Sequence, residues 1–154
     1  MGKLVSFEQK PNYPHCMDNG DAYDLTDGKY LQHDGVKMWM QPGSVGWRSY
    51  ATVSWSIDLG EMLPLGELRY HTGAGLHGAR WPLALYVLVS RDGQNFAFAG
   101  ELIKENYSRL PEYNTGLYNL WLKLSLNVEA RYVSFVVKCE GMFHFVDEIE
   151  LLRG

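Results

Sequence analysis

The sequence predicts one all-β domain over residues 1–154, an antiparallel β-sandwich or jelly roll of about eight strands. Apolar and polar residues alternate at period two through much of the chain beyond residue 51. Clusters of Gly, Asp and Pro separate these stretches, as turns between strands do. No long segment keeps the 3.6-residue period of a helix. A length of 154 residues suits one domain with a proper core.

The expected strands are rich in β-branched and aromatic residues and cover 52–60, 66–72, 83–90, 95–102, 117–127, 131–139 and 143–152. The stretch 83–90 is apolar on both faces, as a central strand is, and ends at the turn signal Arg-Asp-Gly-Gln. Residues 10–49 are irregular and rich in Gly, Asp and Tyr. They are expected to wrap over the sandwich as loops, with at most a short strand.

Composition excludes some classes of partner. The formal net charge is −4, and no Lys/Arg cluster supplies the electrostatic footprint of a nucleic-acid-binding protein. No apolar run approaches the ~20 residues of a membrane span. The first ten residues lack the apolar core of a signal peptide. Two locations therefore stay open: the cytoplasm, or a place outside the cell as a module of a longer secreted chain.

The loops divide into a plain end and a decorated end. If successive antiparallel strands each cross the sandwich once, the loops 39–49, 71–82, 103–116 and 140–143 share one end. These loops are long and rich in aromatic and basic residues, whereas those of the other end are short turns. Binding sites concentrate on loops held by a rigid scaffold. The predicted ligand contacts are Trp47, Arg48, His77, Arg80, Trp81 and Phe143.

That set of residues favours a polar, ring-shaped ligand. Aromatic rings can cover the apolar C–H face of a sugar, while Arg and His bond its hydroxyls. The glycines of "HTGAGLHGARWP", residues 71–82, allow positive φ or a close approach of backbone to ligand.

Two features leave alternatives open. Cys16 and Cys139 are either free thiols or a bridge between the N-terminal segment and a late strand. Trp121 falls on a polar face, next to Asn119 and Lys123. It either packs beneath a wrapped loop of residues 10–49 or forms a second binding patch on a sheet face.

Catalysis is not expected. Asp147 and Glu148 are adjacent on a strand and should face opposite sides. Glu148 and Glu150 share a face and are the remaining carboxylate pair. His71 and His77 have no evident third partner for zinc, and no Gly-x-Ser-x-Gly elbow occurs.

Five short motifs resemble those of a known family. They occur in the family's order, at residues 25–29, 55–60, 90–96, 130–133 and 148–150. The chain resembles the discoidin, or coagulation-factor C-type, domain, whose superfamily includes family 32 carbohydrate-binding modules. This resemblance implies a galactose-binding-domain-like β-sandwich. It also implies a non-catalytic module that binds a glycan through loops at one end, attached to a larger secreted, glycan-active bacterial protein and therefore extracellular or periplasmic.

The resemblance further implies a structural calcium ion. The matching ligands are Asp27 and Glu148, with the backbone carbonyl of Leu25, and hard oxygen ligands suit Ca²⁺. Lys29 departs from the pattern, because a cationic side chain near a cation is unfavourable unless it points away. Asp27 otherwise serves as a turn residue that bonds its own backbone.

The family also contains domains that bind proteins or membrane surfaces, and this is the alternative function. Met142 and Phe143 could form one small apolar spike of the kind that membrane-binding relatives display. The acidic balance of the chain opposes attraction to anionic lipid.

Overall fold

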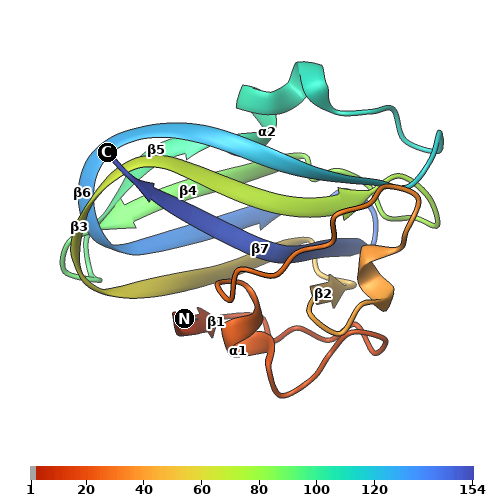
Figure 1. Cartoon of the computed structure of the whole chain (residues 1–154), viewed down its shortest axis with the longest axis horizontal. Coiled ribbons are helices and arrows are strands. Elements are labelled where there is room, and N and C mark those ends of the chain that lie inside the picture. Colours follow the sequence, from red (N-terminus) through yellow and green to blue (C-terminus); the bar gives the residue numbers. More distant parts are fainter. Residues whose placement is uncertain (1–2) are drawn as a thin grey trace.

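Two long, bent strands form the framework of the protein in the computed structural model, which describes residues 3–154. These are β3 (Thr52–Ala74) and β6 (Tyr118–Lys138). They pair antiparallel from Thr52 with Lys138 to Ala74 with Tyr118. Register shifts after Asp58 and after Leu65 interrupt the ladder. Such bulges bend a strand pair, so the two halves of this ribbon lie in opposite layers of a sandwich (Figure 1).

The remaining strands extend both layers from this ribbon in the order β2-β7-β3-β6-β4-β5, with β1 paired to β3. Their bounds are β1 (Val5–Phe7), β2 (Val45–Arg48), β4 (Ala84–Ser90), β5 (Phe96–Glu101) and β7 (Phe143–Arg153). Every pairing is antiparallel. The predicted all-β, antiparallel class is confirmed.

Two predicted turns are absent within residues 3–154. The expected strands 52–60 and 66–72 form one strand, as do 117–127 and 131–139. The two strands bend together at this end and stay hydrogen-bonded, with Leu63 opposite Ala130 and Leu65 opposite Val128. A shared bend therefore replaces the two separate turns that the sequence suggested.

Short helical turns lie outside the sheets: α1 (Asp21–Asp24), η1 (Met38–Met40), α2 (Leu102–Asn106) and η2 (Tyr107–Arg109). The first two belong to the N-terminal segment, which wraps over β7 and the neighbouring strands (Figure 1). Glu101 caps the N-terminus of α2, because its carboxylate accepts a hydrogen bond from the Lys104 amide at 2.7 Å. Among residues 3–154, no helix has the length and apolar character that crossing a bilayer requires.

The core fills the space between the layers. Trp55 and Phe135 stack at 4.3 Å between ring centroids, and Tyr70 packs beside them. Both cysteines are free. Of the two alternatives for Cys16 and Cys139, the structure therefore has free thiols.

Candidate ligand-binding site at the loop end

The long loops meet at one end of the sandwich, as the alternation of loops predicted (Figure 1). The Asn114 amide donates to the Gly75 carbonyl at 2.6 Å, which joins loop 103–116 to loop 71–82. Ala79 pairs with Gly141 in an isolated β-bridge, which joins loop 71–82 to loop 140–143. These backbone contacts make one connected surface of three loops that are distant in sequence.

A groove of about 520 Å³ opens between these loops. Its walls come from residues 80–83 on one side and 107–113 on the other, with Ile103 and Glu140 completing them. The Trp81 indole N–H donates to the Pro111 carbonyl at 2.9 Å, so this ring is fixed across the groove. Tyr113 is fixed as well, because its hydroxyl accepts from the Gly78 amide at 2.9 Å.

The polar groups of the groove lie beside aromatic faces. The Arg80 guanidinium carbon lies 3.9 Å from the centroid of the Tyr113 ring, which holds the guanidinium by a cation–π contact. Glu112 and Glu140 add carboxylates. Tyr107 is 74% exposed at the rim. The groove therefore offers aromatic surface, a planar array of N–H donors and carboxylate acceptors, which suits a polyhydroxylated ring.

The structure brings five of the six predicted ligand residues to this end. Arg80 and Trp81 line the groove. Arg48 and Phe143 are paired neighbours on β2 and β7, and the Phe143 ring lies close to Gly78. His77 is exposed on loop 71–82, with a left-handed φ of 59°.

Trp47 is the sixth, and the structure corrects its assignment. It is only 1% exposed, and its indole N–H donates to the Gln9 carbonyl at 2.7 Å. The N-terminal segment that carries Gln9 covers β2, so Trp47 belongs to the core and presents no face to a ligand. Its ring stacks with His144 instead.

Six groove residues lie outside the predicted set of ligand contacts: Tyr107, Leu110, Pro111, Glu112, Tyr113 and Glu140. The placement of loops 103–116 and 140–143 at this end was the available signal, since Tyr107 and Tyr113 are conspicuous aromatic residues there. Which of them faces the groove depends on contacts such as the one between Gly78 and Tyr113.

The three predicted calcium ligands lie close together around the buried carboxylate of one of them, Glu148. Glu148 is 1% exposed, and its Oε2 has no hydrogen-bond partner among residues 3–154. Burial, followed by the charges of Asp27 and Asp147, raises the pKa of Glu148 to about 8. The Leu25 carbonyl is adjacent, because it accepts from the Ile149 amide at 2.7 Å.

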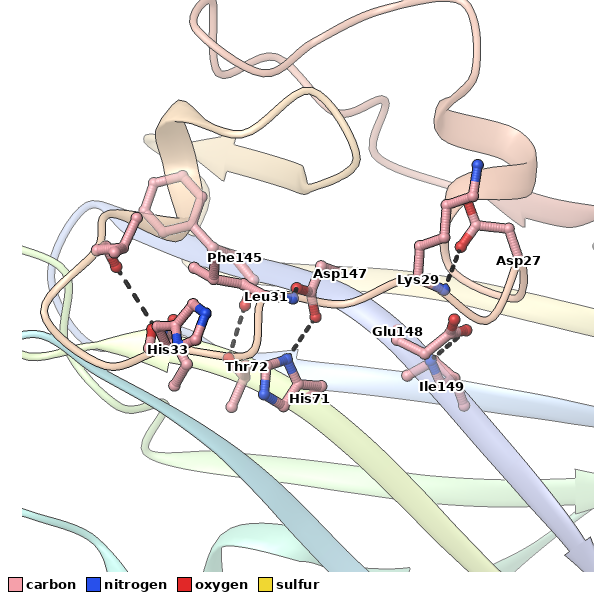
Figure 2. A network of polar contacts seen from close by, with 12 residues as sticks. Asp27, Lys29, Leu31, His33, His71, Thr72, Phe145, Asp147, Glu148 and Ile149 are labelled. Atoms are coloured by element: carbon pink, nitrogen blue, oxygen red, sulfur yellow. Dashed lines mark hydrogen bonds and ion pairs between the residues drawn. The ribbon is translucent and has the colours of Figure 1, made fainter.

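Lys29 does not oppose a cation at this place. Its backbone amide donates to Asp27 Oδ1 at 2.9 Å, which closes the turn. Figure 2 shows the Lys29 ammonium on the far side of the turn from Glu148. An orphaned carboxylate oxygen, a second carboxylate and a carbonyl fit a hard cation.

A bulge alters the predicted relation of Asp147 to Glu148. Along β7, His71 pairs with Glu148 and Thr72 with Val146, so Asp147 is an extra residue. Strict alternation fails at this point, and both carboxylates turn to the wrapped N-terminal segment (Figure 2). The expectation that they face opposite sides is wrong for this reason.

A second acidic cluster lies on and before α1. Oxygens of Asp18, Asp21 and Asp24 all lie within 4.8 Å of one another and could hold a metal ion. Asp21 is 7% exposed, and burial raises its pKa to about 7. Burial also raises the pKa of Asp24, to about 6. None of these three residues is among the predicted calcium ligands.

Solved structures of sugar-binding modules align with the chain over nearly its whole length, among them the following three. A carbohydrate-binding module from Clostridium perfringens, CpGH89CBM32-5 in complex with GalNAc-β-1,3-galactose, is 17% identical with a TM-score of 0.60. That alignment covers 96% of this chain and 93% of the module. The lectin domain of lectinolysin complexed with Lewis B antigen is 13% identical with a TM-score of 0.57, covering 99% and 94%. Chitosan-binding module 1 from a chitosanase/glucanase of Paenibacillus sp. IK-5 is 10% identical with a TM-score of 0.58, covering 99% and 96%.

The chain has the fold of family 32 carbohydrate-binding modules. The sequence itself matches no protein-family model and no curated protein. The motifs that suggested this discoidin-like fold are structural. Arg131 of one motif makes a two-pronged ion pair with Asp58 of another, at 2.9 and 3.0 Å. Asp92 closes the β4–β5 turn by accepting from the Gln94 and Asn95 amides. The discoidin-like fold carries no ligand identity by itself.

Proposed function

We propose that this chain is a non-catalytic carbohydrate-binding module that binds a glycan at the loop-end groove. The groove that joins Arg80 to the aromatic rings of Trp81, Tyr107 and Tyr113 carries the proposal. The known modules of this fold support it, because one was solved with a GalNAc-galactose disaccharide and another with Lewis B antigen. Shallow sites of this kind bind weakly, in the range of about 1 mM to 1 μM.

The parent protein is proposed to be a larger, secreted, glycan-active bacterial protein, which places the module outside the cell or in the periplasm. The chitosan-binding relative supports this reading, since that module derives from a chitosanase/glucanase. The module would hold the parent on its substrate.

Alanine at Arg80 is expected to weaken glycan binding about tenfold or more, because it removes charged donors worth about 1.5–3 kcal/mol. Tyr107→Ala should weaken it severalfold at no cost to the fold, since the ring is 74% exposed. A glycan array names the sugar class, and calorimetric titration measures the affinity.

Arg91→Ala is the matched control, because Arg91 is an exposed arginine on the turn after β4, at the opposite end of the sandwich. It should bind like the wild type. Wild-type affinity in both groove variants would show that the site lies elsewhere.

Binding of a membrane surface is the rival function. Met142 is 56% exposed, but Phe143 packs edge-on against Tyr13 and stacks with Phe145. The spike therefore reduces to one side chain. Sedimentation with vesicles, with and without anionic lipid, separates the two functions.

We also propose that Asp27, Glu148 and the Leu25 carbonyl hold a structural Ca²⁺. The ion would compensate the unpartnered Glu148 oxygen and fasten the turn at residues 25–29 to β7. At calcium twentyfold above Kd, the ion adds about 1.8 kcal/mol to the free energy of unfolding. Chelation is therefore expected to lower Tm by about 4–7 °C.

Glu148→Gln tests whether the effect of chelation comes from this site, because the Tm of this variant should no longer depend on calcium. The acidic cluster of α1 is tested by Asp21→Asn. If Asp21→Asn abolishes the calcium dependence and Glu148→Gln keeps it, the ion sits at α1 and the assignment to Glu148 is wrong.

A further inference from the structure

A second hollow lies on the outer face of the layer formed by β7, β3 and β6. It encloses about 330 Å³ beneath the wrapped segment 30–34. His71, Asn119 and Trp121 line it from the sheet. It shares no lining residue with the loop-end groove. Its volume falls in the range of small-molecule sites.

His71 is held in one orientation at this hollow. Its Nδ1 lies 2.6 Å from Asp147 Oδ1, and Asp147 Oδ2 accepts from the Leu31 amide at 2.7 Å. A carboxylate only accepts hydrogen bonds, so Nδ1 carries the proton. Nε2 is left without a partner among residues 3–154 and lies on the side away from Asp147 (Figure 2). It is a preoriented group for a hydroxyl.

Trp121 supplies an aromatic ring next to the imidazole of His71. Its ring centroid lies 4.7 Å from that of His71, and Tyr30 packs edge-on at 4.9 Å. The first alternative for Trp121, packing beneath the wrapped segment, is thus observed, yet its side chain also lines the hollow and is only half-buried.

The wrapped segment is fixed over the hollow. The Asn119 amide donates to Asp34 Oδ1 at 2.8 Å, and the Asn119 side chain donates to the His33 carbonyl at 2.8 Å. These bonds and the one between Leu31 and Asp147 hold the segment, and His71 contributes through Asp147 and through an edge-on contact with Tyr30 at 5.3 Å. The Nε2 atom of His71 is not used by any of these bonds.

The lining also indicates the ligand. No Lys or Arg side chain lines the hollow, so a phosphate or carboxylate would lack a counter-charge. An indole face, an imidazole nitrogen, amide groups and the Asp34 carboxylate, which accepts hydrogen bonds, suit an uncharged ring with hydroxyls. We propose that this hollow is a second sugar-binding site, where a neutral pyranose stacks on Trp121 and bonds to His71 Nε2. This proposal is independent of the loop-end groove.

The test uses ¹⁹F NMR of the protein labelled with 5-fluorotryptophan, which gives one resonance for each of five tryptophans. Trp→Phe variants assign Trp81 and Trp121. Methyl pyranosides of glucose, galactose, fucose and N-acetylglucosamine are titrated to about 50 mM, well above a ~1 mM Kd. At least one of them should shift the Trp121 resonance saturably.

His71→Gln should weaken that response about tenfold, since it removes one oriented hydrogen bond. His15→Gln, an exposed histidine outside the hollow, is the matched control and should respond like the wild type. Thermal unfolding checks that both variants fold. A Trp121 resonance that no sugar moves, or one that moves equally in His71→Gln, overturns the second site. The Trp81 resonance reports the loop-end groove separately, so the two proposals fail independently.

Discussion

Gly75→Ala is expected to lower the free energy of unfolding by about 3 kcal/mol and to abolish glycan binding at the loop end. Gly75 has a φ of 134°, which L side chains rarely adopt. An added Cβ would lie 1.9 Å from the Gly116 carbonyl oxygen. That neighbour is backbone, so only a displacement of the chain relieves the overlap.

The displacement would spread into the groove. Gly75 donates to the Ala79 carbonyl at 2.8 Å and accepts from the Asn114 amide at 2.6 Å. Ala79 precedes Arg80 and Asn114 follows Tyr113, so these two hydrogen bonds position both walls of the groove relative to Gly75. A shift of about 1 Å between Arg80 and Tyr113 is enough to misplace groups that bind together.

Gly60→Ala provides the matched control. Its φ is 84°, and nothing lies within 4 Å of an added Cβ. It should lose only about 1 kcal/mol from backbone strain and keep its glycan affinity. Urea unfolding and calorimetric titration measure both quantities. Equal losses in the two variants would mean that Gly116 does not constrain Gly75, and that the loops are not fastened together there.

The fold was predictable because its signal is local. Alternation at period two places Val53, Trp55 and Ile57 on one face, and all three are buried in the structure. The sequence did not predict that β3 and β6 each continue through the bend. They do so because the two strands stay paired on both sides of the bulges, and this pairing joins residues that are distant in sequence. Separate short strands and one bent strand leave the same alternation.

The site was predictable only as far as loop placement. Alternation of loops brings Arg80 and Trp81 to the correct end. The burial of Trp47 depends on Gln9, which lies 38 residues away in sequence. The position of Asp147 depends on a β-bulge, which lets Asp147 and Glu148 face the same side of the sheet. Neither contact leaves a periodic signal in the sequence.

The second large effect is expected from His144, which should lower the free energy of unfolding of the wild type in acid. It is 2% exposed, and its Nε2 lies 2.7 Å from the Tyr70 hydroxyl. Burial raises the pKa of Tyr70 well above its usual value, so the hydroxyl keeps its proton and donates it to Nε2. Burial also lowers the pKa of His144 to about 3. The imidazole is therefore neutral in the folded protein.

The direction of this pH dependence follows from which state of the protein binds the proton. Below an unfolded pKa near 6.5, the unfolded chain takes up a proton that the folded protein refuses until pH 3. The contribution of neutral His144 to the free energy of unfolding is present above pH 6.5 and is lost as the pH falls toward 3. At pH 4 this loss is about 3 kcal/mol. The raised pKa values of Asp21 and Glu148 act in the opposite direction, so the wild-type curve alone mixes both effects.

The difference between the wild type and His144→Gln isolates the histidine, because both carry the same carboxylates. Glutamine can still accept from Tyr70 but takes up no proton. Urea unfolding between pH 7.5 and 4 should show the wild type losing about 3 kcal/mol relative to the variant. His15→Gln, at an exposed histidine, should follow the wild type. Parallel curves for the wild type and His144→Gln would mean that the folded protein accommodates a charged imidazole beside Tyr70 and Trp47.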